Sequence, residues 1–250
     1  MPEIFSIAAG DGPVVLFKNQ SGAWVACRTA TTATAQSSTT RNANGAATQN
    51  LSGRGSEVAL IQRAFFSFDT SGISVAPTAA TLKIYGFFRT NGDVIAVRST
   101  HSSTLANGDF DALHNSSTEL GNSDGSGGGT LASVSGLTYS AEIATWSSGG
   151  YNDIVLNSTA RDDMASLDTF KVAVIDYDRD YLDVAPLGTA FVAAGMYFAD
   201  NSGTSRDPKI DYTAGSAASG YSHAVMGVAS GNISAVNGIA TGNIEKVNGV

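Results

Sequence analysis

The sequence predicts an all-β protein: an antiparallel β-sandwich or jelly roll with one short helix and a C-terminal extended repeat arm. Many short runs of β-branched and aromatic residues are bounded by Gly, Asn, Asp or Pro, long polar segments separate them, and they do not alternate with helical segments. We therefore expect a jelly-roll domain at residues 1–214, a linker at 215–223 and the repeat arm at 224–250.

Nine segments carry the strand pattern. Alternation places Phe66 with Phe68, and Leu82 with Ile84, on one sheet face that packs against a second sheet. The expected strands are Val14–Lys18, Trp24–Arg28, Glu57–Asp69, Ala79–Phe88, Asp93–Val97, Asp153–Leu156, Phe170–Asp176, Ala190–Phe198 and Lys209–Tyr212.

One helix and two loops complete the predicted body. The helix spans Ser158–Leu167, with Ser158 as its cap and acidic residues in its first turns. Thr31–Gly55, nearly free of large apolar residues, and the Gly/Ser-rich stretch Gly121–Thr130 are expected to be surface loops.

Composition narrows the classes of function. A hydrophobic fraction of 42% supports a core, and a charged fraction of 14% with abundant small polar residues is typical of β-rich extracellular or particle-surface proteins. The net charge of -8 and the lack of a basic patch argue against nucleic-acid binding. Cys27 is the single cysteine, which excludes an intrachain disulfide and predicts a small buried side chain.

The N-terminal stretch MPEIFSIAAGDGPVVLF has no basic region, and Gly-Asp-Gly-Pro interrupts its apolar runs. It predicts neither a signal peptide nor a membrane span. A protein of surface-like composition without an export signal is expected to leave the cell by another route, such as lysis with release of virus particles.

The last residues repeat an eleven-residue unit. Val225–Ala235 is followed by Val236–Lys246, and a third copy begins at Val247. The Asn-Gly pairs at 237–238 and 248–249 favour tight turns, so short extended pieces joined by turns are predicted. Because so small a unit buries little alone, we expect an attachment arm that pairs as strands with neighbouring subunits or an assembled surface, in a homo-oligomer such as a trimer; a flexible tail is the alternative. Its apolar anchors are Val225, Val228, Ile233, Val236, Ile239, Ile244, Val247 and Val250.

Catalytic patterns are weak throughout. Gly121–Gly125 matches G-x-S-x-G but lacks the strand and helix that a nucleophile elbow needs. The histidines have no other zinc ligands at the spacing of a zinc-binding motif, so we expect their side chains to lie on the surface. The sequence does not show whether any two of the carboxylates lie close enough to act as a catalytic pair. We therefore expect a protein that is not an enzyme. The residues considered are His101, His114, His223, Asp69, Glu142 and Asp153.

Two groups of residues are candidates for ligand binding. Asp176, Asp178 and Asp180 could chelate Ca²⁺ through alternate carboxylates; the alternative is a charged loop network with Arg179 and Asp183. Aromatic side chains that could form a glycan platform, or simply pack in the sandwich, are Trp24, Trp146 and Tyr151.

Three stretches resemble a known family. They are RAFFSFDTSGISVAPTAATLKIYGFF (Arg63–Phe88), YNDIVLN (Tyr151–Asn157) with the later FKVAVIDYDRD, and DPKIDY (Asp207–Tyr212). In order and spacing, over residues 10 to 214, they resemble the DNRLRE-type jelly-roll modules of bacterial surface proteins and phage particles. Repeats of the V-N-G-V kind are similar to those of phage and marine-virus structural proteins.

The resemblance implies a structural protein of a phage virion, such as a capsid decoration, head fibre or tail appendage. Its expected partners are capsid or tail proteins of the same virion and other copies of the chain, with no nucleic acid and no membrane. It would be made in the host cytoplasm and displayed on the virion surface. The alternative is a carbohydrate-binding adhesion module that recognises cell-surface glycans.

Overall fold

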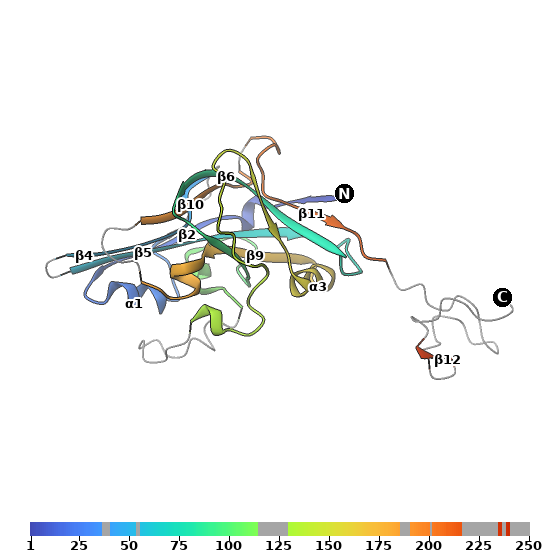
Figure 1. Cartoon of the computed structure of the whole chain (residues 1–250), viewed down its shortest axis with the longest axis horizontal. Helices are drawn as coiled ribbons and strands as arrows, with labels where there is room; N and C mark the ends of the chain where they lie inside the picture. Colours follow the sequence, from blue (N-terminus) through green and yellow to red (C-terminus); the bar gives the residue numbers. More distant parts are fainter. Residues whose placement is uncertain are drawn as a thin grey trace.

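The computed structural model describes residues 1–36, 41–53, 56–114, 130–185, 191–200, 202–216, 235–236 and 239–240. The chain folds mainly into antiparallel β-sheet, which confirms the prediction of an all-β protein (Figure 1). Among the described residues no helix is long and apolar enough to span a membrane.

The body strands form one continuous sheet. Its main path runs β1 (Glu3–Phe5), β11 (Lys209–Thr213), β6 (Ala79–Thr90), β10 (Phe191–Tyr197), β4 (Arg41–Gly53), β5 (Ser56–Asp69), β2 (Gly12–Gln20) and β3 (Ala35–Gln36). Off this path, β8 (Tyr151–Val155) pairs with β6, β9 (Thr169–Asp176) pairs with β5, and β7 (Val94–Arg98) pairs with β9.

The first core lies between the two halves of this sheet. Phe66 and Phe68 of β5 meet Leu82 and Ile84 of β6 in one cluster of buried side chains, so the two predicted inward pairs are confirmed. The ring of Phe66 stacks on that of Phe198, with centroids 5.5 Å apart. The body is therefore sandwich-like, as the alternation indicated.

A second core covers the opposite face of β5 and β9. Phe65 and Ile61 of β5 and Ala173 and Ile175 of β9 point into it. The helix α1 (Ala23–Arg28) and loop side chains such as Phe110 close it from outside. Both faces of these strands are therefore buried, and the polar residues Gln62, Arg63 and Ser67 of β5 are buried with them.

The segment Trp24–Arg28 was predicted as a strand and is instead the helix α1. Ala23, Trp24 and Cys27 are buried while Val25 is 51% exposed. This spacing is that of one face of a helix, whereas a strand would bury every second residue. Gly22 precedes the helix with φ of 69°, a left-handed conformation that glycine adopts easily. The prediction that Cys27 is buried is confirmed.

The polar stretch Thr31–Gly55 was predicted as a loop, but most of it forms β3 and β4. β4 pairs with both β5 and β10. A Cβ on Gly45 would lie 2.6 Å from the Ala194 carbonyl oxygen and 2.7 Å from the Met196 side chain. The strand therefore carries small residues because its neighbours approach closely, and the pattern lacks the large side chains that usually mark a strand.

The single predicted helix appears as α3 (Ser158–Ser166), capped one residue earlier than expected by Asn157, whose side chain accepts from Ala160 N. Short turns complete the body: the 3₁₀ helices η1 (Ala8–Gly10), η2 (Asn107–Asp111) and η3 (Leu131–Ser133), and the π-helix η4 (Tyr177–Tyr181). The predicted loop at 121–129 lies outside the described residues.

Within the repeat arm, β12 (Ala235–Val236) and β13 (Ile239–Ala240) pair antiparallel, with Val236 opposite Ile239. They form a two-stranded sheet separate from that of the body. This pairing agrees with short extended pieces on either side of Asn237-Gly238. The other arm positions and residues 217–223 of the linker lie outside the described residues.

Candidate binding groove beside strand β8

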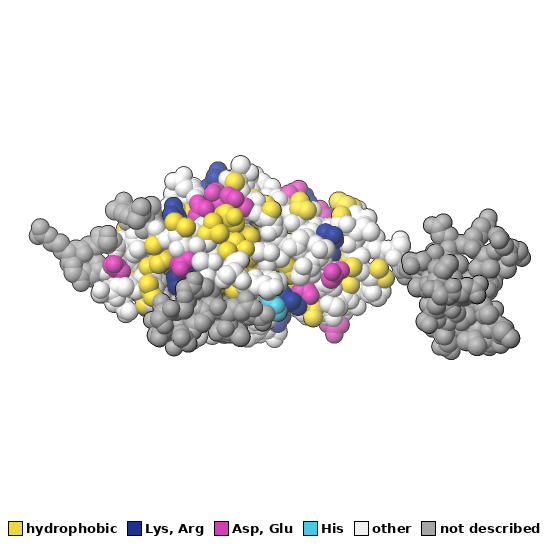
Figure 2. All heavy atoms as spheres, turned by 60° about the horizontal axis from the view of Figure 1, so that its bottom comes forward, with side chains coloured by type: hydrophobic (Ala, Val, Ile, Leu, Met, Phe, Trp, Pro, Cys, Tyr) yellow, Lys and Arg dark blue, Asp and Glu magenta, His cyan; other side chains and the backbone are white. Residues whose placement is uncertain are grey.

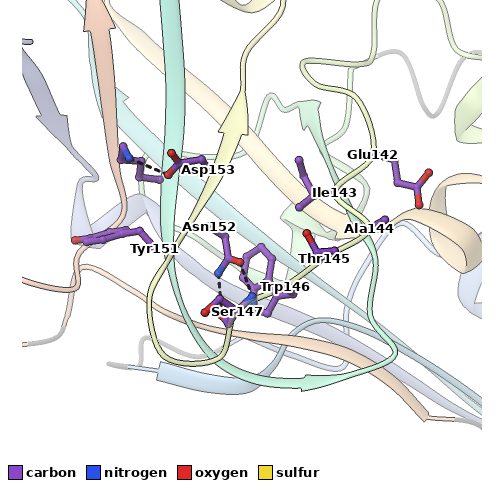
Figure 3. A pocket seen from close by; sticks show the side chains of 10 residues that line it. Glu142, Ile143, Ala144, Thr145, Trp146, Ser147, Tyr151, Asn152 and Asp153 are labelled. Carbon is purple, nitrogen blue, oxygen red and sulfur yellow. Dashed lines mark hydrogen bonds and ion pairs between the residues drawn. The ribbon is translucent and has the colours of Figure 1, made fainter.

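A groove with a volume of about 820 Å³ opens beside β8 (Figure 3). The segment 142–147 lies on one side of it and β8 lies on the other. Its lining residues are Lys83, Glu142, Ile143, Ala144, Thr145, Trp146, Ser147, Tyr151, Asn152 and Asp153.

Polar contacts fix the position of residues 146–147 beside the groove. The Asn152 side chain accepts from Ser147 N at 2.7 Å, and its amide donates to the carbonyl oxygens of Ser147 at 3.0 Å and Ile84 at 3.3 Å. The Trp146 indole donates to the Gly195 carbonyl oxygen at 3.0 Å. These bonds hold residues 146–147 against the sheet.

Gly86 makes this close approach sterically feasible. A Cβ at Gly86 would lie 1.8 Å from the Ser147 carbonyl oxygen, a backbone atom that a rotamer change cannot move away. The position of the segment 146–147 therefore depends on glycine in β6.

The walls of the groove are polar and charged. Lys83 Nζ binds Asp153 Oδ1 at 2.8 Å, and Glu142 is exposed on the opposite side. The Tyr151 hydroxyl lies 3.1 Å from the Asp207 carbonyl oxygen, to which it donates, and burial raises the pKa of this phenol. The groove thus offers both signs of charge at its rim.

A row of aromatic rings continues from Tyr151 across the sheet. The Tyr85 ring meets the rings of Tyr151 and Tyr197 edge-on, at centroid distances of 5.3 and 5.5 Å. Arg206 lies 4.9 Å above Tyr197, and Lys209 Nζ lies 5.4 Å from the Tyr151 centroid. These cations occupy ring faces that a sugar would otherwise stack on.

The three candidate glycan-binding aromatics do not share one surface. Trp146 and Tyr151 both line the groove, but Trp146 is only 5% exposed. Trp24 belongs to the second core, where its indole donates to Asp183 Oδ1 at 3.1 Å. The structure therefore brings two of the three together and gives both tryptophans packing roles.

The three candidate calcium ligands point to different partners. Asp176 Oδ1 accepts from Arg179 N at 2.7 Å and caps η4, Asp180 is buried against Arg63, and Asp178 is exposed. No three His, Cys, Asp or Glu side chains among the described residues are grouped to hold a metal ion. Calcium at Asp180 would have to compete with Arg63 for the carboxylate.

Charged side chains at this loop contact Arg28, a residue that the predicted network of Arg179 and Asp183 did not include. Arg28 Nε lies 3.2 Å from Asp183 Oδ1, and a second Arg28 nitrogen lies 3.4 Å from Asp180 Oδ1. Burial raises the pKa of Asp176 to about 7, because the ionised carboxylate is desolvated. Asp176 and Asp180 thus organise the turn after β9.

His101 was predicted to lie on the surface and is fully buried. Its Nδ1 lies 2.8 Å from Ser99 Oγ, and its Nε2 lies 2.8 Å from Ser67 Oγ and 3.0 Å from the Gly10 carbonyl oxygen. Burial, with the nearby charge of Lys171, lowers the pKa of His101 to about 4. Polar neighbours in the sequence had suggested exposure, but Ser67 and Ser99 are themselves inside.

Two of the three carboxylates considered for paired chemistry line the same groove, on opposite sides and without contact to each other in Figure 3. Glu142 and Asp153 line its two sides, whereas Asp69 is exposed and bound to Ser71. Sequence reasoning missed Lys83 and Asn152, because nothing along the chain shows that β6 and β8 are neighbours. His223 and the G-x-S-x-G stretch lie outside the described residues.

Comparison with known proteins finds no family model that matches the chain and no curated protein that matches it. The resemblance to jelly-roll modules of phage particles therefore stays a prediction.

Proposed function

We propose that the chain is a non-enzymatic structural protein of a phage particle, in which the β body is displayed and the repeat arm attaches it to neighbouring subunits. The observation that carries the proposal is the β12–β13 pair. Residues at the junction of the first two copies and within the second copy form strands, and in the part of the chain that the structure describes these strands pair with each other and with no body strand.

The packing of the body is consistent with this attachment role for the arm. Two apolar clusters pack against opposite faces of the strands β5 and β9, which gives a stable core that leaves the arm available for contact. The proposed partners are capsid or tail proteins of the same particle and further copies of the chain. A net charge of -8 is unfavourable for binding nucleic acid.

Deletion of everything after Ala218 tests the proposal. We expect the truncated protein to keep the melting transition of the body, because the arm strands add nothing to its sheet. Its incorporation into particles, measured by mass spectrometry of purified virions, should be lost.

A matched control replaces residues 219–250 with a Gly/Ser segment of equal length, which keeps the bulk but removes the apolar anchors. It should behave like the deletion. If either variant enters particles at the level of the full chain, the attachment role is wrong.

The glycan-binding alternative stays a prediction, and the groove is a candidate location for it. Tyr151, Glu142 and Asp153 provide hydroxyl and carboxylate groups there. A glycan array with the full chain and with Tyr151→Ala tests it, and specific binding that the substitution abolishes would favour this second function.

A further inference from the structure

We infer that the groove is an acceptor for a β-strand, and that its occupant is an extended segment of the repeat arm from a second copy of this chain. The inference rests on the proposed attachment role of the arm and adds the place at which the arm binds. It depends on three features: the free edge of β8, the space beside it, and the composition of the arm.

The backbone register shows that one edge of β8 is unpaired. In the part of the chain that the structure describes, β8 pairs only with β6, with Leu82 opposite Ile154. Leu156 N donates to the Ala80 carbonyl oxygen, so the even-numbered residues of β8 hydrogen-bond toward β6. The peptide groups of the alternate residues Tyr151, Asp153 and Val155 therefore point away from β6.

The groove runs along this edge, since residues 151–153 line it. The opposite segment is held away from β8 by β7: Ile143 N donates to the Val94 carbonyl oxygen at 2.8 Å, and Val94 N donates back at 3.2 Å. At about 3.3 Å per residue, the five residues of β8 present an edge about 16 Å long. An exposed edge of this kind is a template for strand addition.

Side chains around the edge suit the composition of the arm. Val155 is 68% exposed and Ile143 is half-buried, so apolar surface is available beside the free peptide groups. The arm supplies one Val or Ile every three to five residues, separated mainly by small residues that fit beside the bound Ser147–Asn152 end. Lys246 offers a cation for Glu142.

The second copy follows from the pairing within one chain. β12 and β13 are extended, yet they pair with each other and not with β8. A strand donated between copies would give the β8 edge the backbone partner that it lacks among the described residues, and would link subunits in the way that the proposed function requires.

Disulfide trapping between full-length chains tests this contact. One chain carries Thr145→Cys on the groove wall and the other carries Val236→Cys in the arm; the native Cys27 is buried and does not interfere. Under mild oxidation we expect a disulfide between the two different chains. A matched control places the first cysteine at Val25, which is 51% exposed on α1 beside the second core, and should trap at least tenfold less.

A backbone substitution provides the second measurement. Val155→Pro removes an N–H from the free edge while leaving the even-numbered bonds to β6, and proline is tolerated at such edges. We expect its melting temperature to stay near that of the wild type and its self-association in sedimentation velocity to fall at least tenfold. Val155→Thr keeps the N–H and should associate normally.

Equal trapping at Thr145 and Val25, or unchanged association of a folded Val155→Pro chain, would overturn the inference. Glycan binding is the other outcome to measure. If the chain binds a glycan, if Val155→Pro keeps that binding, and if a synthetic peptide of residues 224–250 does not displace the glycan, the groove is a glycan site and not a strand acceptor. If deletion of the arm abolishes incorporation into particles but trapping fails, the arm attaches elsewhere and the proposed function stands without this site.

Discussion

Arg63 and Asp180 form a buried two-pronged ion pair, with Arg63 Nε 2.7 Å from Asp180 Oδ2 and Arg63 NH2 2.8 Å from Asp180 Oδ1. Arg63 also donates to the Phe110 carbonyl oxygen at 2.7 Å and lies over the Phe110 ring. The pair ties β5 to the turn η4 beneath the second core. An aspartate that the sequence suggested as a calcium ligand is thus the anchor of a loop.

Substitution Asp180→Asn should destabilise the protein by roughly 3–5 kcal/mol, because it leaves the Arg63 charge buried without its carboxylate. Urea unfolding measures the change. Asp178→Asn, two residues away and exposed, is the matched control and should stay within about 0.5 kcal/mol of the wild type. Equal effects of the two substitutions would mean that the ion pair does not hold the loop.

Phe66→Ala should cost roughly 3–5 kcal/mol of unfolding free energy, because the fully buried ring leaves a cavity against Phe198. Phe88, which is 38% exposed, provides a comparison in which alanine costs clearly less. A loss below about 1 kcal/mol at Phe66 would contradict its place in the first core.

Acidification should destabilise the protein through His101. Its pKa is about 4 in the folded state, against an ordinary value of 6.5, so the unfolded chain binds more protons below pH 6.5. The stability that His101 contributes is complete above pH 6.5 and falls by about 3 kcal/mol as pH decreases to 4. The difference in unfolding free energy between wild type and His101→Gln should follow this curve, and a constant difference would contradict it.

Asp11 should have the opposite effect. Its carboxyl is buried, with Oδ2 accepting from Ala199 N at 2.8 Å, and burial raises its pKa from 3.8 to about 7. The folded state therefore holds the extra proton, and the Asp11 contribution to stability decreases by about 3 kcal/mol as pH rises from 4 to 7.

Asp11→Asn should remove this dependence, so its stability relative to wild type should rise with pH up to about 7 and then level off. Asp153→Asn, an exposed carboxylate, is the control that should leave the slope unchanged. A parallel pH curve for Asp11→Asn would show that the buried carboxyl keeps an ordinary pKa.

Gly86→Ala should destabilise the body by about 1–3 kcal/mol and displace the segment 146–147, because the new methyl group overlaps the Ser147 carbonyl. Gly149→Ala is the control, since a Cβ there meets nothing within 4 Å. Trp146 fluorescence reports the displacement. An unchanged spectrum in Gly86→Ala would contradict the tight packing at the end of the groove.

The strands with large apolar residues could be predicted from the sequence, because alternation and length act locally. β4 could not be predicted, because its small residues are explained by the close packing of Met196 and Ala194, which belong to a strand far away in the sequence. α1 could not either, because AWVACR suits a strand as well as a helix, and only the second core beneath it selects the helical face.

For the candidate site, the sequence indicated Tyr151 and Trp146 as aromatics of interest but not that β6 and β8 would be neighbours. Lys83 and Asp153 are 70 positions apart, and their ion pair follows from strand pairing alone. The buried position of His101 likewise depends on hydrogen bonds to Ser67 of β5 and to Ser99, which follows β7. The contacts of Lys83 with Asp153 and of Ser67 with His101 join residues that are far apart in the sequence, and a single sequence does not show which distant segments pair.

The pairing of β1 with β11 places the N-terminus and the end of the last body strand on the same side of the body. Glu3 lies opposite Asp211, so the N-terminal residues and the point at which the chain leaves toward the arm share one end, while the β4–β5 hairpin lies at the other (Figure 1). A space-filling view shows apolar and charged side chains distributed along the body between these poles (Figure 2). A body tethered by its arm would hold the hairpin pole outward, so that pole would be the first part of each subunit to meet an approaching cell or antibody.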